Sequence, residues 1–188
     1  MPDMKNEIQH RKSTRLKEYD YSNAGYYFVT ICSAQMKHQF GEIRYNKMIF
    51  NNTGNIINNF WPKIPEHFNN VELDYYQLMP NHLHGIIIID SIDIVGDGSP
   101  VPKSKSGEGE PFPYEKKNSL CDIIGYFKYQ TTKAINNLYN TPRNKIWQRS
   151  FYDRIIRNEK ELYSIRKYIQ QNPLKWEIEK NTSENLMM

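Results

Sequence analysis

Hydrophobic and polar positions in the N-terminal half of the chain follow patterns that are typical of β-strands. Residues 26–32 are almost all β-branched or aromatic and follow turn-forming residues, which predicts a strand. Residues 40–43 predict a shorter strand. Two further runs, residues 71–79 and 83–90, are joined through a Met-Pro-Asn sequence, in which proline fixes one backbone angle and asparagine tolerates turn geometry. We expect these two runs to form a hairpin.

Apolar residues at helical spacing predict two helices on either side of this hairpin in the sequence. The first covers residues 52–68, and two prolines limit its C-terminal end. The second begins after Ser119, which forms a capping signal with Asp122, and its apolar stripe continues to Leu138.

A third helix is predicted from a capping pair that precedes another apolar stripe. Asn158 is followed three residues later by Glu161, a combination typical of a helix N-terminus. Because Pro173 does not continue a regular helix, we expect this helix to end at Asn172. The residues that share its buried face are Leu162, Ile165 and Ile169.

The order strand, helix, hairpin, helix predicts an α+β fold. Such an order is typical of a ferredoxin-like antiparallel sheet with helices packed on one face. With 188 residues, one core buries roughly 70% of the surface that the unfolded chain exposes, so we expect a single domain over residues 1–188. Residues 91–118 are rich in Gly, Ser, Pro and Lys and lack apolar periodicity, which indicates a flexible insertion, and we expect mobile termini as well.

Composition places the chain among globular proteins. With 38% hydrophobic and 24% charged residues, it is too apolar for a disordered chain and too polar for a membrane protein. The longest aliphatic run, residues 86–89, is far shorter than the roughly 20 residues of a spanning helix, so we expect a cytoplasmic protein that contacts no membrane. Cys32 and Cys121 stand far apart in apolar contexts, which favours free thiols over a disulfide.

The formal net charge of +4 is unevenly distributed along the chain. One group of basic residues lies between positions 11 and 17, and a second lies between positions 143 and 157. Two such groups favour a polyanionic partner, although ordinary solvated charges would produce the same pattern.

His82 and His84 are candidates for metal binding. Residues two apart on a strand point to the same face, so the two imidazoles converge while Leu83 enters the core. Neutral imidazole is a common metal ligand, and such a pair leaves coordination positions open for a phosphate and water. An ordinary pair of surface histidines is the alternative.

Tyr168 and Asn172 are one turn apart at the edge of the apolar stripe of the third helix. A tyrosine in this place is ordinarily a packing residue, and an asparagine before proline is ordinarily a helix terminator. Their pairing also permits a phenol nucleophile beside an amide oxygen that ligates the same metal as the histidines.

Three short motifs stand in a fixed order along the chain. They are Met79-Pro80-Asn81-His82-Leu83-His84-Gly85, Trp147-Gln148-Arg149 and Tyr168-Ile169-Gln170-Gln171-Asn172-Pro173. In this order they resemble the REP-associated tyrosine transposases of the single-tyrosine HUH transposase superfamily. The resemblance runs from near Arg15 to Trp176, interrupted by the polar insertion, but Ser13-Thr14-Arg15 stands where family members commonly carry Tyr-Arg-Arg.

The resemblance implies a catalytic metal site that acts on DNA. His82 and His84 would bind Mg²⁺ or Mn²⁺, Asn172 would be a further metal ligand, and Tyr168 would be the nucleophile. The substrate would be single-stranded DNA near repeat hairpins, and the cut would leave a 5′-phosphotyrosine link and a free 3′-hydroxyl. A second 3′-hydroxyl can reverse this step without ATP, which gives strand transfer. We expect a monomer rather than a homodimer.

Single-stranded DNA is bound by basic grooves and aromatic platforms. The residues that we predict to contact DNA are Lys128, Lys133, Arg149, Tyr152, Arg154 and Arg157. Two other functions stay open. The same fold without chemistry would be a nucleic-acid-binding module. A metal-free hydrolase with a histidine base is less favoured, because no serine or cysteine stands in a nucleophile motif.

Overall fold

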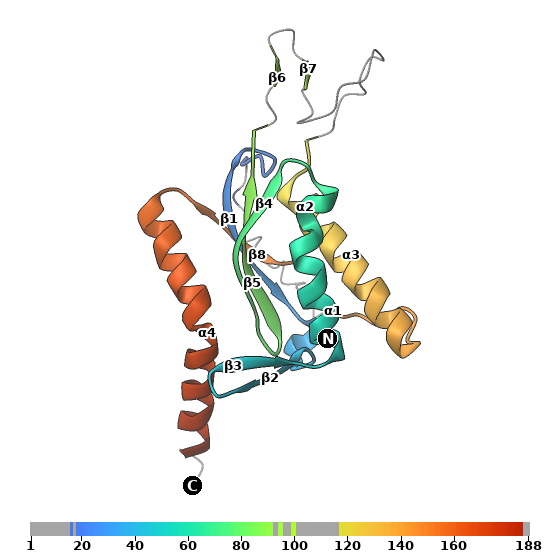
Figure 1. Ribbon diagram of the computed structural model, residues 1–188, viewed down its shortest axis with the longest axis vertical. Helices are drawn as coiled ribbons and strands as arrows, with labels where there is room; N and C mark the ends of the chain where they lie inside the picture. The colour runs from blue at the N-terminus through green and yellow to red at the C-terminus, as the bar shows by residue number, and fades with distance from the viewer. Residues whose placement is uncertain (1–15, 17, 92–93, 96–98, 101–116, 186–188) are drawn as a thin grey trace, which may run out of the picture.

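A four-stranded antiparallel sheet forms the centre of the protein (Figure 1). The computed structural model describes residue 16 and residues 18–91, 94–95, 99–100 and 117–185. In spatial order the strands are β4 (Val71–Leu78), β5 (His82–Ile89), β1 (Gly25–Cys32) and β8 (Tyr152–Ile156). The predicted strand at residues 26–32 and the predicted hairpin are therefore confirmed as β1 and as β4 with β5.

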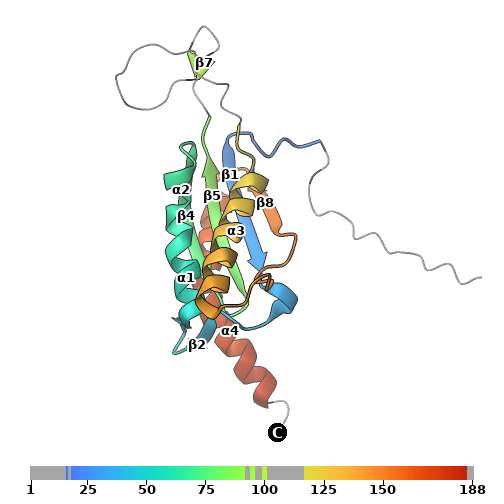
Figure 2. The ribbon, with the colours of Figure 1, turned by 90° about the vertical axis from the view of Figure 1, so that its right-hand side faces the viewer.

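Three helices, α1 (Asn52–Phe60), α2 (Ile64–His67) and α3 (Leu120–Tyr139), cover one face of the sheet (Figures 1 and 2). The larger hydrophobic core lies between them and the sheet. Alternate residues of β1 enter this core because side chains on a strand alternate between its faces. Tyr27, Val29 and Ile31 are fully buried there. The capping box predicted for α3 is confirmed, with Ser119 and Asp122 each bonding the other's backbone N–H.

The opposite face of the sheet is covered by one long helix, α4 (Glu159–Asn185; Figure 2). Ile165 and Ile169 of α4 pack against Ile86 and Phe28, which are residues of β5 and β1 that point away from the larger core. The predicted α+β class, with an antiparallel sheet and helices packed on it, is confirmed. The prediction that the helices gather on one face is wrong, because the even-numbered apolar residues of β1 and β5 form a second apolar surface, and α4 covers it on the face opposite α1, α2 and α3.

Helix α4 does not end at Asn172, so the predicted boundary at Pro173 is wrong. Proline removes one backbone hydrogen bond from a helix, but contacts with the rest of the protein compensate for this loss beyond Pro173. The Trp176 ring lies 5.9 Å from the His82 ring, and Glu177 accepts a hydrogen bond from the backbone N–H of Asn46.

The turn at Asn46 belongs to a small hairpin of β2 (Gly41–Arg44) and β3 (Lys47–Phe50), which lies near the C-terminal half of α4 (Figure 1). The short strand predicted at residues 40–43 corresponds to β2. The helix predicted over residues 52–68 is divided at its prolines into α1, a 3₁₀ turn (Trp61–Lys63) and α2.

Most of the predicted insertion at 91–118 and all basic residues of the N-terminal group lie outside the described residues. Within the described part of the insertion, β6 (Ile94–Val95) pairs with β7 (Ser99–Pro100).

Cys32 and Cys121 are both free thiols, as predicted. Within the described part of the chain, every helix is too short or too polar to cross a membrane.

Candidate active site

The site begins at the first residues of β5, where the turn from β4 fixes the strand register. The backbone N–H of Met79 donates to the carbonyl of His82, and His84 stands opposite Thr30 of β1. His82 and His84 point to the α4 face, with their ring centroids 4.5 Å apart, while Leu83 between them is fully buried in the opposite core. The predicted convergence of the two imidazoles is therefore what the structure shows.

Helix α4 brings Tyr168 to this histidine pair. The Tyr168 phenol oxygen lies 3.3 Å from Nε2 of His84, and the two ring centroids are 5.2 Å apart. Phe28 of β1 stacks on the His84 ring and contacts the edge of the Tyr168 ring, which fixes both rings. Tyr168 is nevertheless 40% exposed, so part of this side chain is open to solvent beside the buried His84.

Asn172 lies between the contacts that α4 makes with the two histidines. Tyr168 contacts His84 and Trp176 contacts His82, and Asn172 is one helical turn from each, on the same face. Asn172 is buried, and its side-chain nitrogen has no hydrogen-bond partner. A half-turn of this amide would place its oxygen, a metal ligand, where the nitrogen now stands.

Asn81 fixes the orientation and the tautomer of the His82 ring. The amide nitrogen of Asn81 donates to the carbonyl of Met36, so its amide oxygen is the atom that lies 2.6 Å from Nδ1 of His82. Because this oxygen only accepts, Nδ1 of His82 carries the hydrogen and Nε2 keeps a lone pair. Gln35 and Met36 both have positive φ angles, and the turn that they form presents this carbonyl.

Thr30 holds the second ring at the equivalent atom. Its hydroxyl oxygen lies 2.8 Å from Nδ1 of His84. When Tyr168 donates to Nε2 of His84, Nδ1 of the same ring carries the hydrogen and donates to Thr30. Both histidines therefore have Nδ1 bonded to the protein and a lone pair on Nε2, an arrangement common among metal-binding histidines.

Burial keeps both imidazoles neutral at physiological pH. It lowers the pKa of His82 to about 4, and the nearby His38 makes a smaller contribution to this shift. Burial also lowers the pKa of His84 to about 3, with a second contribution from His82. A neutral ring is the metal-binding form, so the site does not have to lose protons before it binds a cation near pH 7.

The donor set fits a cation that accepts both nitrogen and oxygen ligands. Among the described residues, no cluster of three or more His, Cys, Asp or Glu side chains is placed to hold a metal ion. Two imidazoles and one buried amide supply three donors, and the amide has an unsatisfied polar atom. Such a set suits Mn²⁺ better than Mg²⁺, which prefers oxygen ligands, and it leaves coordination positions for a phosphate.

The chain is 38% identical over 170 residues to an uncharacterized protein of Haemophilus influenzae (strain Rd), an alignment that covers 90% of this chain and 92% of the relative. The two proteins belong to one family. No model of a known protein family matches the chain.

A solved structure of a REP-associated tyrosine transposase bound to a REP hairpin shares the fold of this family member. Its TM-score is 0.54 at 17% sequence identity, and the match covers 86% of this chain and 73% of the transposase chain. At this identity, the likeness concerns the arrangement of the sheet and helices rather than the chemistry.

Two of the predicted DNA-contacting residues lie on the same face of the sheet as the histidines. Tyr152 of β8 stands opposite Thr30, and Arg154 stands opposite Phe28, and directly opposed residues of neighbouring strands share a face. Tyr152 is 54% exposed, whereas Arg154 forms an ion pair of 2.6 Å with Glu161. Arg157 is exposed and follows β8, next to the start of α4.

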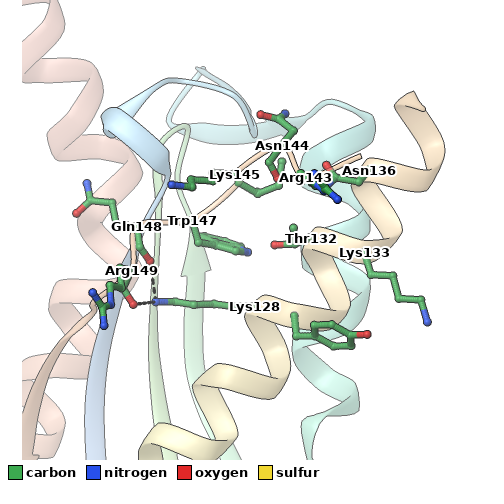
Figure 3. A pocket seen from close by; sticks show the side chains of 12 residues that line it. Lys128, Thr132, Lys133, Asn136, Arg143, Asn144, Lys145, Trp147, Gln148 and Arg149 are labelled. Atoms are coloured by element: carbon green, nitrogen blue, oxygen red, sulfur yellow. Dashed lines mark hydrogen bonds between the residues drawn. The ribbon is translucent and has the colours of Figure 1, made fainter. Parts of the chain in front are cut away.

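The other predicted DNA-contacting residues lie in a groove between α3 and the segment that leads to β8 (Figure 3). Lys133 and Arg149 are exposed at this groove. Lys128 has a structural role, because its ammonium group donates to the carbonyl oxygens of Gln148, Arg149 and Ser150. The predicted set is thus divided between the two faces of the sheet.

Several residues that shape the site were not singled out by the sequence. Asn81 directly precedes His82 in the sequence, and this position was a signal that it could orient the histidine ring. Thr30 and Phe28 can be assigned to the site only when the pairing between β1 and β5 is known. Trp176 can be assigned to it only when α4 is known to continue beyond Pro173.

Proposed function

We propose that this protein cuts and rejoins single-stranded DNA, with Tyr168 as the nucleophile and a divalent metal bound by His82, His84 and Asn172. The observation that carries the proposal is the 3.3 Å contact between the Tyr168 phenol oxygen and Nε2 of His84. This contact brings together a candidate nucleophile and a candidate metal ligand that are 84 positions apart in the sequence. The fold shared with a REP-associated tyrosine transposase supports the same reaction class.

The bound metal ion, Mn²⁺ or Mg²⁺, would polarise a non-bridging phosphate oxygen and orient the scissile phosphate. Tyr168 is positioned for attack because Phe28 and His84 hold its ring while the residue stays partly exposed. The phenol oxygen forms a bond to phosphorus as the bond from phosphorus to the 3′-oxygen breaks. The phenol proton is lost to solvent, and the departing 3′-oxygen gains a proton.

Lys175 helps to hold the Tyr168 ring from the same helix. Its ammonium nitrogen lies 5.3 Å from the centre of this ring, which is a cation–π contact. Because one phosphodiester replaces another, the 3′-hydroxyl of a second strand reverses the reaction, and strand transfer requires no ATP.

The DNA is held outside the reacting centre by exposed aromatic and basic side chains. Tyr152 offers an aromatic ring for stacking on the same face as His84, and Arg157 offers a positive charge near the end of β8. The transposase with the shared fold was solved with a REP hairpin, and we propose a hairpin-bearing single strand as the substrate here. Tyr168 of α4 reaches His84 of its own sheet, and we propose a monomer that acts in the cytoplasm.

The experiment is a search for covalent protein–DNA adducts on a denaturing gel. The protein is incubated with randomised and hairpin-bearing single-stranded oligonucleotides in Mn²⁺, in Mg²⁺ or in chelator. We expect a metal-dependent adduct that is lost in His82→Ala and in His84→Ala, while His67→Ala, which alters a histidine outside the site, retains it. Salt-sensitive DNA binding without any adduct would overturn the proposal in favour of a nucleic-acid-binding module.

A further inference from the structure

A basic groove lies on the opposite side of the sheet from the tyrosine and histidine site. It has a volume of about 490 Å³. Figure 3 shows that its lining side chains come from α3 and from residues 143–149. Its positively charged side chains are Lys128, Lys133, Arg143, Lys145 and Arg149. No aspartate or glutamate is among the described residues that line it. A groove of this charge favours an anionic ligand.

The walls of the groove are held in place by internal hydrogen bonds. Lys128 bonds three consecutive carbonyl oxygens at residues 148–150, and the side-chain nitrogen of Asn136 donates to the carbonyl of Asn144. The indole N–H of Trp147 donates to Thr131, and both side chains are buried. The groove is therefore a formed site whose shape does not depend on a ligand.

The cations that remain available are those that project into solvent. Lys133, Arg143, Lys145 and Arg149 are all exposed, whereas the charge of Lys128 is engaged by the backbone. Tyr129, which is 63% exposed, adds an aromatic face at the groove. Exposed cations beside an exposed ring are the combination that binds single-stranded nucleic acid, because the cations contact phosphates and the ring stacks on an unpaired base.

The backbone connects this groove to the proposed active site across β1. The N–H of Gln148 donates to the carbonyl of Cys32, and Cys32 pairs on its other side with His82. Gln148 and His82 are therefore two strand spacings apart, or about 10 Å. A DNA strand that leaves the histidine face at this end of the sheet reaches the groove by passing around the edge at residues 148–150.

We propose that this groove binds the single-stranded DNA that flanks the cut site, through its phosphates and through one base stacked on Tyr129. The identity of the strand rests on the proposed function, whereas nucleic-acid binding by the groove does not. A fully paired stem offers no free base face to Tyr129, which favours an unpaired strand.

The test compares two variants that lose the same charge. The groove variant is Lys133→Gln/Arg143→Gln/Lys145→Gln, and the control is Lys47→Gln/Lys63→Gln/Lys160→Gln, which alters exposed lysines elsewhere. Both are made in a Tyr168→Phe background, and their folding is compared by thermal denaturation. Fluorescence anisotropy then measures the affinity for a single-stranded oligonucleotide at several salt concentrations.

We expect the groove variant to weaken binding and to lower the slope of log K against log salt by about 2, since each lost contact to a single strand contributes roughly 0.7. The control is expected to change the slope by much less. Tyr129→Ala alone is expected to weaken binding roughly 5- to 100-fold. Equal losses in the two triple variants, or a loss confined to duplex DNA, would overturn the proposal.

Oligonucleotide length separates this proposal from the proposed function. With Tyr168 restored, the groove variant should form adducts normally on short oligonucleotides that span only the cut site, and poorly on longer ones. Equal adduct formation on both lengths would overturn the groove as the site of flanking DNA. If the protein forms no adduct on any DNA while the groove variant still loses affinity, the proposed function fails and the groove remains a binding site.

Discussion

The phenol oxygen of Tyr168 lies 3.3 Å from Nε2 of His84, so the proposed nucleophile and a proposed metal ligand share one hydrogen bond. A metal ion at Nε2 displaces this bond, which costs about 0.5–1.5 kcal/mol. We therefore expect Tyr168→Phe to bind Mn²⁺ as tightly as the wild type or up to about tenfold more tightly, as measured by calorimetry. Tyr163→Phe, on an exposed part of α4, is the matched control. Much weaker binding by Tyr168→Phe would mean that the phenol itself ligates the metal.

The hydrogen bond from His82 to Asn81 leads to a prediction about the tautomer of the His82 ring. In the metal-free protein, ¹⁵N NMR should find the hydrogen on Nδ1 of His82, because the Asn81 amide oxygen accepts it. Asn81→Ala should loosen the ring and weaken Mn²⁺ binding roughly 10- to 100-fold. Asn59→Ala, on the exposed surface of α1, should leave the affinity unchanged. A wild-type His82 with its hydrogen on Nε2 would contradict this account.

The buried histidines predict a loss of stability in acid when the protein is kept free of metal. An unfolded histidine binds a proton near pH 6.5, whereas the pKa is about 4 for folded His82 and about 3 for folded His84. The two histidines therefore make their whole contribution to the free energy of unfolding above about pH 6.5. This contribution is lost as the pH falls from there towards the pKa values of the folded protein. Between neutral pH and pH 5 we expect a loss of about 2–4 kcal/mol.

Urea denaturation in chelator, at neutral pH and at pH 5, measures this loss. His82→Gln/His84→Gln should lose much less stability than the wild type over the same interval. His67→Gln, which changes an exposed histidine elsewhere, should behave as the wild type does. An equal loss in the double variant and the wild type would assign the acid sensitivity to other groups.

Gly85, which follows the two histidines, has a packing role that two glycine substitutions test. A Cβ at Gly85 would lie 2.4 Å from the fully buried Trp61 ring, whereas a Cβ at Gly125 of α3 meets no atom within 4 Å. We expect Gly85→Ala to lower the free energy of unfolding by about 1–3 kcal/mol. Gly125→Ala should raise it by about 0.5–1 kcal/mol. Urea denaturation measures both, and a neutral Gly85→Ala would contradict the packing that positions β5.

The sequence predicts the parts of the fold that local patterns determine. The strand ending at Cys32, the hairpin with His82 and His84, and the start of α3 at Ser119 all have a strong local signal, and the structure confirms each of them. The placement of the histidine pair is local as well, because residues two apart on a strand such as β5 have their side chains on one face.

The remaining features depend on contacts between distant residues. β8 alternates exposed and half-buried residues at the edge of the sheet and is recognisable only from its pairing with β1. Pro173 indicates a helix end, and only the contacts of Trp176 and Glu177 with distant residues favour continuation. Lys128 is recognised as a structural residue only once the carbonyl groups around it are placed.

The most direct test of the central claim is the identity of the residue that becomes linked to DNA. The protein is incubated with single-stranded oligonucleotides and Mn²⁺, digested with nuclease and protease, and analysed by mass spectrometry. The account predicts a nucleotide attached through phosphate to Tyr168, and no such peptide from Tyr168→Phe. A nucleotide attached to another tyrosine, such as Tyr152 or Tyr163, or an adduct formed by Tyr168→Phe, would contradict it.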